Sequence, residues 1–387
     1  MHVSNPPEQS IDAAIIGGGI AGVWALDLLL AKGYNAILLE ADSLGCDQTL
    51  ASQGMIHGGL KYALSGNVTG ASEAIADMPD RWRACLAGED DVNLSGTRLL
   101  SAHYYMFADS SALGRLTAFF ASKTLRGRID KLKRQQWPSE FEGFSGVVYT
   151  LNDFVLDTAD LLATLYRGHE HRTFRLAVDA QRISCAKTGG YNLRLDDTTV
   201  HVKQLISCAG NGSEALLKHL RVDEIEVQYR PLKQVVVKPT HQTPMYAHCL
   251  TGITSSEPRL TITSHSGDDG LIWYLGGQLA TKGASRSDAE QIAAAAAELH
   301  NCVPWLDWQG AQYDVLTFDR AEPKQDSGLK PDQAYVRRVA DFIQCFPTKL
   351  TLAPDMGDRL LAVMDPPVSS SPLTTEHPRA AIGKPPW

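Results

Sequence analysis

Several features that would assign a protein at once are missing from this sequence. No apolar run approaches the ~18 residues that a membrane-spanning helix needs, so we expect no integral membrane segment. Residues 1–10 are polar and offer no apolar core of a secretory signal, which favours a cytoplasmic protein and leaves peripheral membrane association open. The net charge is −8, with acids and bases mixed and no basic block, which argues against nucleic acid as a partner.

Cysteine and histidine patterns are equally uninformative about metals and disulfides. The 7 cysteines are scattered and odd in number, and none forms a Cys-x-x-Cys pair, so we expect reduced and mostly buried thiols. The 12 histidines show no spacing typical of metal ligands, and we predict no metal site. At 387 residues the chain is long for one domain, which favours two.

The informative stretch is at the start of the chain. Ala13–Ile16 is a short apolar run, as expected for a strand buried on both faces, and a Gly-x-Gly-x-x-Gly turn follows it. In such a turn Gly17 would allow the tight bend, Gly19 would let the backbone approach a pyrophosphate, and Gly22 would let the next helix pack closely on the strand. This pattern predicts the binding of an adenine dinucleotide.

The segment after the turn supports the same interpretation. A helix is expected over roughly residues 19–32, apolar all round and therefore buried, and its N-terminus at Ile20 and Ala21 would present N–H groups to an anion. A second strand, Ala36–Glu40, should follow. Glu40 then lies about 20 residues past the glycines, where a carboxylate binds a ribose hydroxyl. Because Glu40 would repel a 2′-phosphate, we expect an unphosphorylated ribose.

A second group of glycines and hydroxyls begins directly after this unit. The segment Thr49–Tyr62 contains Thr49, Ser52, His57 and Gly58, residue types that let a backbone run close to a flat, anionic ligand. Taken alone, the segment is also compatible with an ordinary flexible loop in which His57 has a purely structural role.

Farther along, the pattern alternates between two kinds of segment. Residues 225–280 are rich in short strands separated by Pro and Gly turns, which predicts an antiparallel sheet. The stretch Gln204–Asn211 and residues 341–364 return to the apolar pattern of the first residues. We therefore predict a mixed α/β fold in which a Rossmann-type nucleotide domain is interleaved with a substrate domain. The nucleotide domain would comprise residues 1–80, 150–222 and 325–387, and the substrate domain residues 81–149 and 223–324.

Four ordered motifs resemble those of the D-amino-acid-oxidase-like (DAO) superfamily of FAD enzymes, and within it FAD-dependent glycerol-3-phosphate dehydrogenase most closely. The first is the glycine turn, and the second is residues 56–62, Ile-His-Gly-Gly-Leu-Lys-Tyr, with Lys61 where the family usually has arginine. The third is the strand end Cys208–Asn211. The fourth is Lys349–Thr351, which matches a Gly-Gly-Lys-Leu/Ile-Thr-Thr motif but has Pro347 and Thr348 in place of its glycines.

This resemblance implies non-covalent FAD in an extended conformation. The adenine end would lie at Glu40 and near Ala180, the pyrophosphate at the glycine turn, and the flavin ring between the His57 and Lys349 segments. The expected cofactor-binding residues are Gly17, Gly19, Ile20, Ala21, Gly22, Glu40, Thr49, Ser52, His57, Gly58, Ala180, Ala209, Gly210, Lys349, Leu350 and Thr351.

The family chemistry would move a hydride from a small amino acid, amine, hydroxy acid or polyol phosphate to flavin N5. Arg320 is the candidate anchor for an anionic group, since a guanidinium grips a carboxylate or phosphate with two hydrogen bonds, and Lys61 is a second candidate. His57 would handle the proton or orient the substrate. Tyr274 is the fourth candidate catalytic residue, because it lies on a strand that resembles the floor of the family's substrate pocket. The plainer alternatives are a surface ion pair for Arg320, a solvated Lys61 and a core position for Tyr274.

Two other functions stay open at this point. One is an NAD-dependent dehydrogenase, although the His57 segment and the interleaved domains favour FAD. The other is a flavoprotein without turnover that acts as a binding partner. The sequence leaves open the substrate, the electron acceptor (oxygen, a quinone or a protein) and the choice between monomer and dimer.

Overall fold

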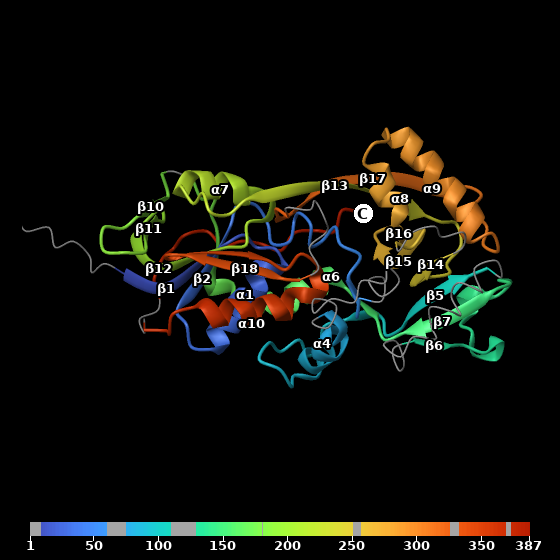
Figure 1. Cartoon of the computed structure of the whole chain (residues 1–387), viewed down its shortest axis with the longest axis horizontal. Coiled ribbons are helices and arrows are strands. Elements are labelled where there is room, and N and C mark those ends of the chain that lie inside the picture. The colour runs from blue at the N-terminus through green and yellow to red at the C-terminus, as the bar shows by residue number, and fades with distance from the viewer. Residues whose placement is uncertain are drawn as a thin grey trace, which may run out of the picture.

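The computed structural model describes residues 9–59, 75–109, 129–179, 181–250, 257–325, 333–368 and 373–387. Two large sheets organise these residues, and Figure 1 shows them side by side along the longest axis of the molecule. The α-helices of the described residues are α1 (Ile20–Ala31), α4 (Met78–Ala87), α6 (Thr158–Tyr166), α7 (Ser213–Leu220), α8 (Gln278–Gly283), α9 (Asp288–Cys302) and α10 (Ala353–Val363).

The first sheet has a parallel core with antiparallel strands at its edges. The parallel strands are in the order β9-β2-β1-β12-β19, with antiparallel β11 and β10 beyond β12 and antiparallel β18 beyond β19. Their bounds are β1 (Gln9–Ile16), β2 (Ala36–Glu40), β9 (Thr173–Arg175), β10 (Ile183–Cys185), β11 (Tyr191–Arg194), β12 (Thr199–Ser207), β18 (Tyr335–Val339) and β19 (Phe342–Phe346). The strands expected over residues 13–16 and 36–40, and the helix between them, are confirmed.

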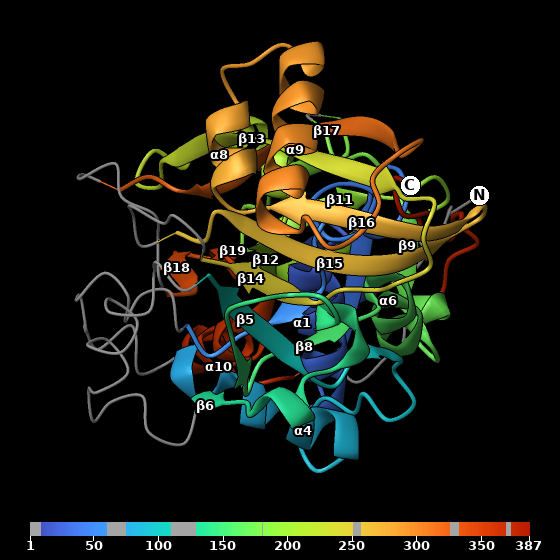
Figure 2. The same cartoon turned by 90° about the vertical axis from the view of Figure 1, so that its right-hand side faces the viewer.

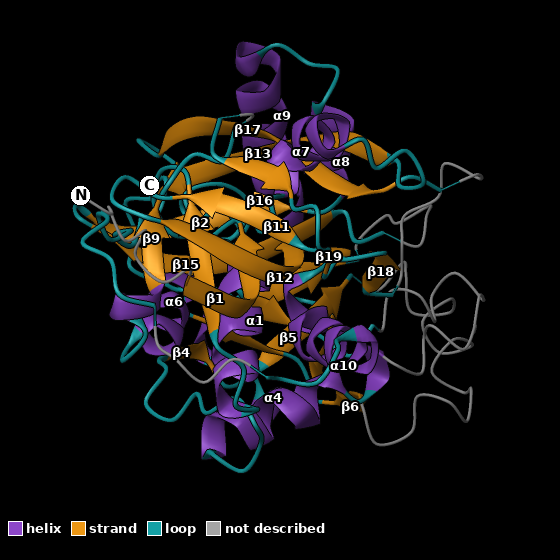
Figure 3. Cartoon of the chain, turned by 90° about the vertical axis from the view of Figure 1, so that its left-hand side faces the viewer, coloured by secondary structure: helices purple, strands orange, loops and turns teal. Residues whose placement is uncertain are grey.

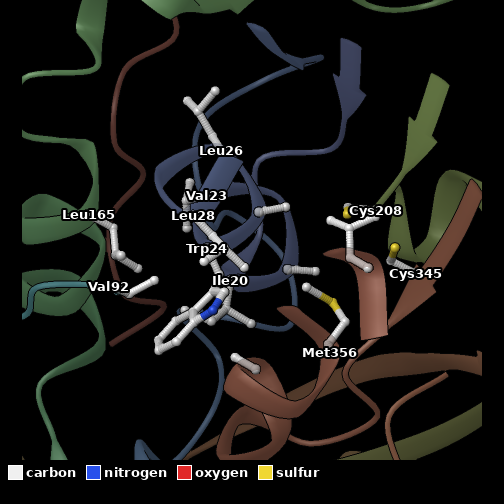
Figure 4. Packing of buried hydrophobic residues seen from close by; sticks show 14 of the residues in the cluster. Ile20, Val23, Trp24, Leu26, Leu28, Val92, Leu165, Cys208, Cys345 and Met356 are labelled. Carbon is white, nitrogen blue, oxygen red and sulfur yellow. The ribbon is translucent and has the colours of Figure 1, made fainter. Parts of the chain in front are cut away.

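Both faces of this sheet are covered, which is why its strands read as continuous apolar runs. Ala13 and Ile15 belong to the core beneath α1, α6 and α10, whereas Ala14 and Ile16 belong to the core beneath α7. Figure 4 shows the first of these cores, where Trp24 of α1 packs among side chains from α10 and from the strands. Helices α1 and α10 lie side by side in Figure 1 although more than 300 residues separate them in the chain.

The second sheet is mostly antiparallel, in the order β17-β13-β16-β15-β14-β5-β7-β6. Its strands are β5 (Tyr104–Ala108), β6 (Ile129–Lys131), β7 (Val147–Leu151), β13 (Val227–Lys238), β14 (Ala247–Cys249), β15 (Leu260–Gly267), β16 (Gly270–Gly276) and β17 (Gln312–Pro323). The antiparallel sheet expected over residues 225–280 is confirmed for β13, β16, β15 and β14, and β14 then pairs in parallel with β5, which lies outside that range. Two hairpin units meet at that junction, and Figure 2 shows α8 and α9 covering one face of the sheet.

The strands β13 and β17 connect the two halves of the molecule. They pair over their full lengths, from Val227 opposite Pro323 to Lys238 opposite Gln312. Figure 1 shows this ribbon extending from the first sheet across to the second, and Figure 3 shows its strands near the top of the view, above α1, α6 and α10. A small third sheet joins β3 (Met55–Ile56), β8 (Phe154–Leu156) and β4 (Leu99–Ser101), so the segment before His57 is part of a sheet.

The predicted mixed α/β fold is confirmed. Asp157, a residue type that favours the start of a helix, caps α6, since its side chain accepts hydrogen bonds from the amides of Ala159 and Asp160.

Residues 111–125, where Leu113, Leu116, Phe119 and Phe120 recur at helical spacing and predict a helix, lie outside the described residues, and the domain boundaries stay a prediction. Among the described helices, none combines the length and the apolar composition that crossing a membrane requires.

Candidate functional site

A cavity of about 530 Å³ extends from the glycine turn to the β13–β17 ribbon. Residues from four distant parts of the sequence line it. The predicted site residues among them are Gly17, Gly19, Ile20, Ala21, Glu40, Thr49, Ser52, His57, Ala209, Gly210, Arg320, Lys349 and Leu350. The structure thus brings together both ends of the proposed ligand site in one continuous space.

The glycine turn has no room for larger side chains. Gly17 has a φ of +104°, and a Cβ atom there would lie 2.4 Å from the carbonyl oxygen of Cys208. A Cβ atom on Gly22 would lie 1.8 Å from the carbonyl oxygen of Gly17. Gly17, Gly19 and the first residues of α1 line the cavity, so their backbone is open to the phosphates of a dinucleotide. These residues fit FAD.

Two polar side chains hold this turn in place. The hydroxyl oxygen of Thr49 accepts a hydrogen bond from the amide of Ile20 at 2.9 Å, at the start of α1. Oε2 of Glu40 accepts one from the amide of Gly18 at 2.6 Å, and Oε1 accepts one from the amide of Asp42 at 2.9 Å. Glu40 therefore shapes the turn as well as facing the cavity, where its predicted ribose contact would be made.

His57 lies in a rigid frame. Its amide donates to the Thr351 hydroxyl oxygen at 3.2 Å, and that hydroxyl donates to the His57 carbonyl oxygen at 3.1 Å. Nδ1 of the ring accepts a hydrogen bond from the amide of Gly59 at 3.1 Å, so in the neutral ring the proton is on Nε2. The adjacent Gly58 donates its amide to Asp153 at 2.9 Å and does not line the cavity. Thr351 is fully buried and positions His57 from behind.

The opposite wall comes from the segment after β19. Pro347, Thr348, Lys349 and Leu350 all line the cavity. Thr348, which stands where the resembled motif has glycine, has a φ of +60°, a left-handed conformation that a β-branched residue rarely adopts. Its hydroxyl donates to the carbonyl oxygen of Gln333 at 3.0 Å, which helps to hold this backbone. The backbone at Thr348 thus keeps a conformation that glycine adopts readily, even though the side chain differs.

At the far end, the β13–β17 ribbon presents charged side chains to the cavity. Arg320 lines it, and so does Arg230, the residue directly opposite on β13. Glu322 is 2% exposed, and its Oε1 accepts a hydrogen bond from Nε of Arg230 at 2.7 Å. On this ribbon, the sequence predicted a site role only for Arg320. Alternation along β13 could have indicated Arg230, Leu232 and Gln234 as a shared face, and all three line the cavity.

Tyr274 lies behind the cavity wall and not on it. The side chain is fully buried, and its hydroxyl oxygen lies 2.7 Å from the Ala51 carbonyl oxygen and 2.9 Å from Oε1 of Gln234, two acceptors that share its one hydrogen. Burial raises the pKa of this phenol far above its usual value, so it stays protonated. Gln53, which the sequence did not single out, crosses from the other side and donates to the carbonyl oxygens of Thr261 and Tyr274 at 3.1 and 2.9 Å. These contacts fasten the segment containing Thr49 and Ser52 to the second sheet.

Several other residues complete the picture. Burial raises the pKa of the Asp47 carboxyl, although Asn211 donates to it at 2.6 Å. His248 lines the cavity and lies 3.1 Å from the Thr261 hydroxyl.

Lys61 and Ala180 lie outside the described residues. Within the part of the chain that the structure describes, no group of His, Cys, Asp or Glu side chains is arranged to hold a metal ion.

Comparison with known proteins points in one direction. Residues 12–319 match the family described as "FAD dependent oxidoreductase" (DAO). The chain is 41% identical to the probable FAD-dependent oxidoreductase PA4991 of Pseudomonas aeruginosa, over 99% of this chain and 98% of that protein. The crystal structure of that protein matches with a TM-score of 0.82 at 36% identity, over 99% of both chains.

Two more distant proteins also match. The aerobic glycerol-3-phosphate dehydrogenase of Escherichia coli is 38% identical over 69 residues, which is 18% of this chain and 14% of that protein. The FAD-bound L-α-glycerophosphate oxidase of Mycoplasma pneumoniae has a TM-score of 0.64 at 15% identity, over 94% of this chain and 97% of that chain, which shows a shared fold. The protein therefore belongs to the DAO family of FAD-dependent oxidoreductases.

Proposed function

We propose that this FAD-dependent oxidoreductase oxidises a small amino acid, amine, hydroxy acid or polyol phosphate that carries an anionic group. The observation that carries the proposal is the continuity of one cavity, which has the glycine turn at one end and Arg320 at the other, with His57 and Lys349 also on its wall. A cofactor bound at the turn would therefore share its space with a substrate held at the ribbon. Bound FAD supplies the electron chemistry, taking a hydride at N5.

Arg320 is proposed to anchor the anionic group of the substrate. Its guanidinium offers planar, paired donors, and its strand is fixed by pairing with β13 over twelve residue pairs. A rigid strand holds an anchor more precisely than a loop does, which helps to hold the reacting C–H bond in place.

His57 is proposed to orient the substrate and not to remove its proton. Because Nδ1 accepts the Gly59 amide, Nε2 of the neutral ring carries a hydrogen and can only donate. A donor at this position suits a substrate hydroxyl, amine or carboxylate lone pair. Lys349, on the wall that Thr351 adjoins, would contribute positive charge near the cofactor.

The proposal is tested by loading the purified protein with FAD and adding amino acids, 2-hydroxy acids and polyol phosphates without oxygen. We expect one class to bleach the visible flavin absorption, and Arg320→Ala to raise the substrate concentration needed at least tenfold while FAD stays bound. Re-oxidation with oxygen, a quinone or a protein acceptor then identifies the electron acceptor. A protein that binds FAD but is bleached by none of these substrates would instead be a flavoprotein without turnover of its own.

A further inference from the structure

Two arginines on neighbouring strands line the cavity. Arg230 and Arg320 are directly opposite in the antiparallel register, and both line the cavity. Residues directly opposite in such a pair point to the same face, with Cβ atoms about 5 Å apart. The next pair toward the cavity interior, Leu232 and Phe318, also lines the cavity, which confirms that this face of the ribbon is turned inward. Like charges at such positions repel unless a counter-charge offsets them.

Glu322 supplies that counter-charge from the same face of the ribbon. It is 2% exposed, so its carboxylate is stable there only when paired and hydrogen-bonded. Nε of Arg230 donates to its Oε1 at 2.7 Å, Nη2 lies 2.5 Å from the same oxygen, and Gln228 donates to it at 3.4 Å. The arrangement fixes the Arg230 guanidinium by one edge and is a built feature of the cavity wall.

We propose that Arg230 and Arg320 together clamp one carboxylate of the substrate, with Glu322 as the positioning residue that sets the orientation and the charge of the clamp. This proposal rests on the proposed oxidation of an anionic substrate and narrows its class to small carboxylic acids. The two arginines and Glu322 sum to one positive charge, which matches a carboxylate. A phosphate monoester carries about −1.5 to −2 at neutral pH and is undercompensated by the same three groups.

The test measures anion binding directly on the FAD-loaded protein. Acetate and methylphosphonate are titrated at constant ionic strength, and binding is followed by the change in visible flavin absorption and by the shift in melting temperature. We expect the wild-type protein to bind acetate at least tenfold more tightly than methylphosphonate. Tighter binding of methylphosphonate would overturn the proposed selectivity.

Paired substitutions test whether the Arg230–Glu322 pair contributes to acetate binding. The double variant Arg230→Met/Glu322→Met removes both charges of the pair at once, so no unpaired buried charge remains. We expect it to weaken acetate binding at least tenfold, to raise KM for the oxidised acid with little change in kcat, and to retain FAD. The matched control is Arg259→Met/Glu298→Met, a similar ion pair whose residues do not line the cavity, and it should leave acetate binding unchanged. Unchanged acetate binding in the Arg230 variant would overturn the clamp.

Glu322→Gln gives an independent measurement if the double variant does not fold. It removes one negative charge and keeps the shape, so we expect the preference for acetate over methylphosphonate to fall at least tenfold. An unchanged preference would contradict the role given to Glu322.

The clamp and the proposed reaction can fail separately. If acetate binding depends on Arg230 but no acid bleaches the flavin, the clamp is retained and the proposed reaction is rejected. If an acid bleaches the flavin and its KM is the same in the double variant as in the wild type, the reaction is retained and the clamp is rejected.

Discussion

At the scale of single residues, the two outer glycines of the turn are required for different reasons. Gly17 needs the left-handed backbone conformation and has the Cys208 carbonyl against it. Gly22 is helical, so its constraint is purely one of space against the Gly17 carbonyl oxygen. Figure 4 shows Ile20 and Trp24 of this helix in the same buried core as Cys208 and Met356.

This distinction gives a prediction for Gly22→Ala. A Cβ atom at 1.8 Å from a backbone oxygen must push α1 away from β1, so we expect loss of bound FAD and a destabilisation on the order of 2–3 kcal/mol from overpacking. The control is Gly33→Ala at the other end of the same helix, where φ is +82° but the added atom meets nothing within 4 Å. That variant should lose about 1 kcal/mol and keep its FAD. Flavin content after gel filtration and urea unfolding measure both effects, and equal FAD loss in the two variants would contradict the spatial argument.

At the scale of elements, strand β16 holds the segment that contains Thr49 and Ser52 in place through Tyr274. The Tyr274 hydroxyl donates to the Ala51 carbonyl oxygen, between Thr49 and Ser52, and Gln53 donates back to the carbonyl oxygen of Tyr274. A strand of the second sheet therefore fixes the geometry of a segment that contacts the glycine turn. This supports a positioning role for Tyr274 in place of the catalytic one first considered.

Tyr274→Phe tests this positioning role. It removes the one hydrogen that the Ala51 carbonyl oxygen and Oε1 of Gln234 share, which costs about 1–3 kcal/mol of stability. We expect the dissociation constant for FAD to rise about tenfold, which corresponds to about 1.4 kcal/mol, while kcat of the FAD-saturated protein changes little. Tyr104→Phe is the control, because that buried hydroxyl likewise shares its one hydrogen between two carbonyl oxygens, those of Ala247 and Ile262, and none of its hydrogen bonds reaches the Thr49 segment. A large fall in kcat for Tyr274→Phe alone would instead favour a catalytic phenol.

At the scale of the whole molecule, the end of the described chain ties distant parts together. Residues 373–387 form bridges to Leu44 and Phe174 at the first sheet. Trp387 then stacks on the second sheet, with its ring 4.5 Å from that of His265 and 5.2 Å from that of Tyr274. The Pro- and Ser-rich composition of residues 365–387 predicts an extended or loosely ordered tail, and its described last part contacts both sheets. It covers His265, and burial lowers the pKa of this imidazole to about 4.

A buried neutral histidine makes the stability of the whole fold depend on pH. The unfolded imidazole titrates near pH 6.5 and the folded one near 4, so the unfolded state binds more protons between these values. Stability is therefore complete above about pH 6.5 and declines as the pH falls toward 4. From pH 7 to pH 5 we expect His265 to account for a loss of about 2 kcal/mol.

Urea unfolding of the FAD-saturated protein at pH 7 and pH 5 measures this loss. His265→Gln should reduce the pH dependence by that amount, since an amide does not titrate. Other groups, including His241, whose pKa burial also lowers, contribute to both proteins alike and cancel in the comparison. An identical loss in the variant and in the wild-type protein would show that His265 is protonated equally easily in both states.

Local features were decided by the sequence itself. The glycine turn, the Ala36–Glu40 strand and the Asp157 cap each depend on residues within a few positions of one another, where spacing and backbone preference set the structure. The four ordered motifs also indicated FAD, which family membership confirms.

Only the tertiary structure decided which side chains meet at the far end of the cavity. The pairing of Arg230 with Arg320 depends on the register of two strands that are about 90 residues apart, and a shift of β17 by one residue would turn Arg320 to the other face of the ribbon. The two hydrogen bonds between His57 and Thr351 join residues that are 294 positions apart in the chain. The placement of Tyr274 behind the wall depends on how the second sheet packs. Periodicity determines which face of a strand is shared, but the partner of that face is selected by the packing of the whole chain.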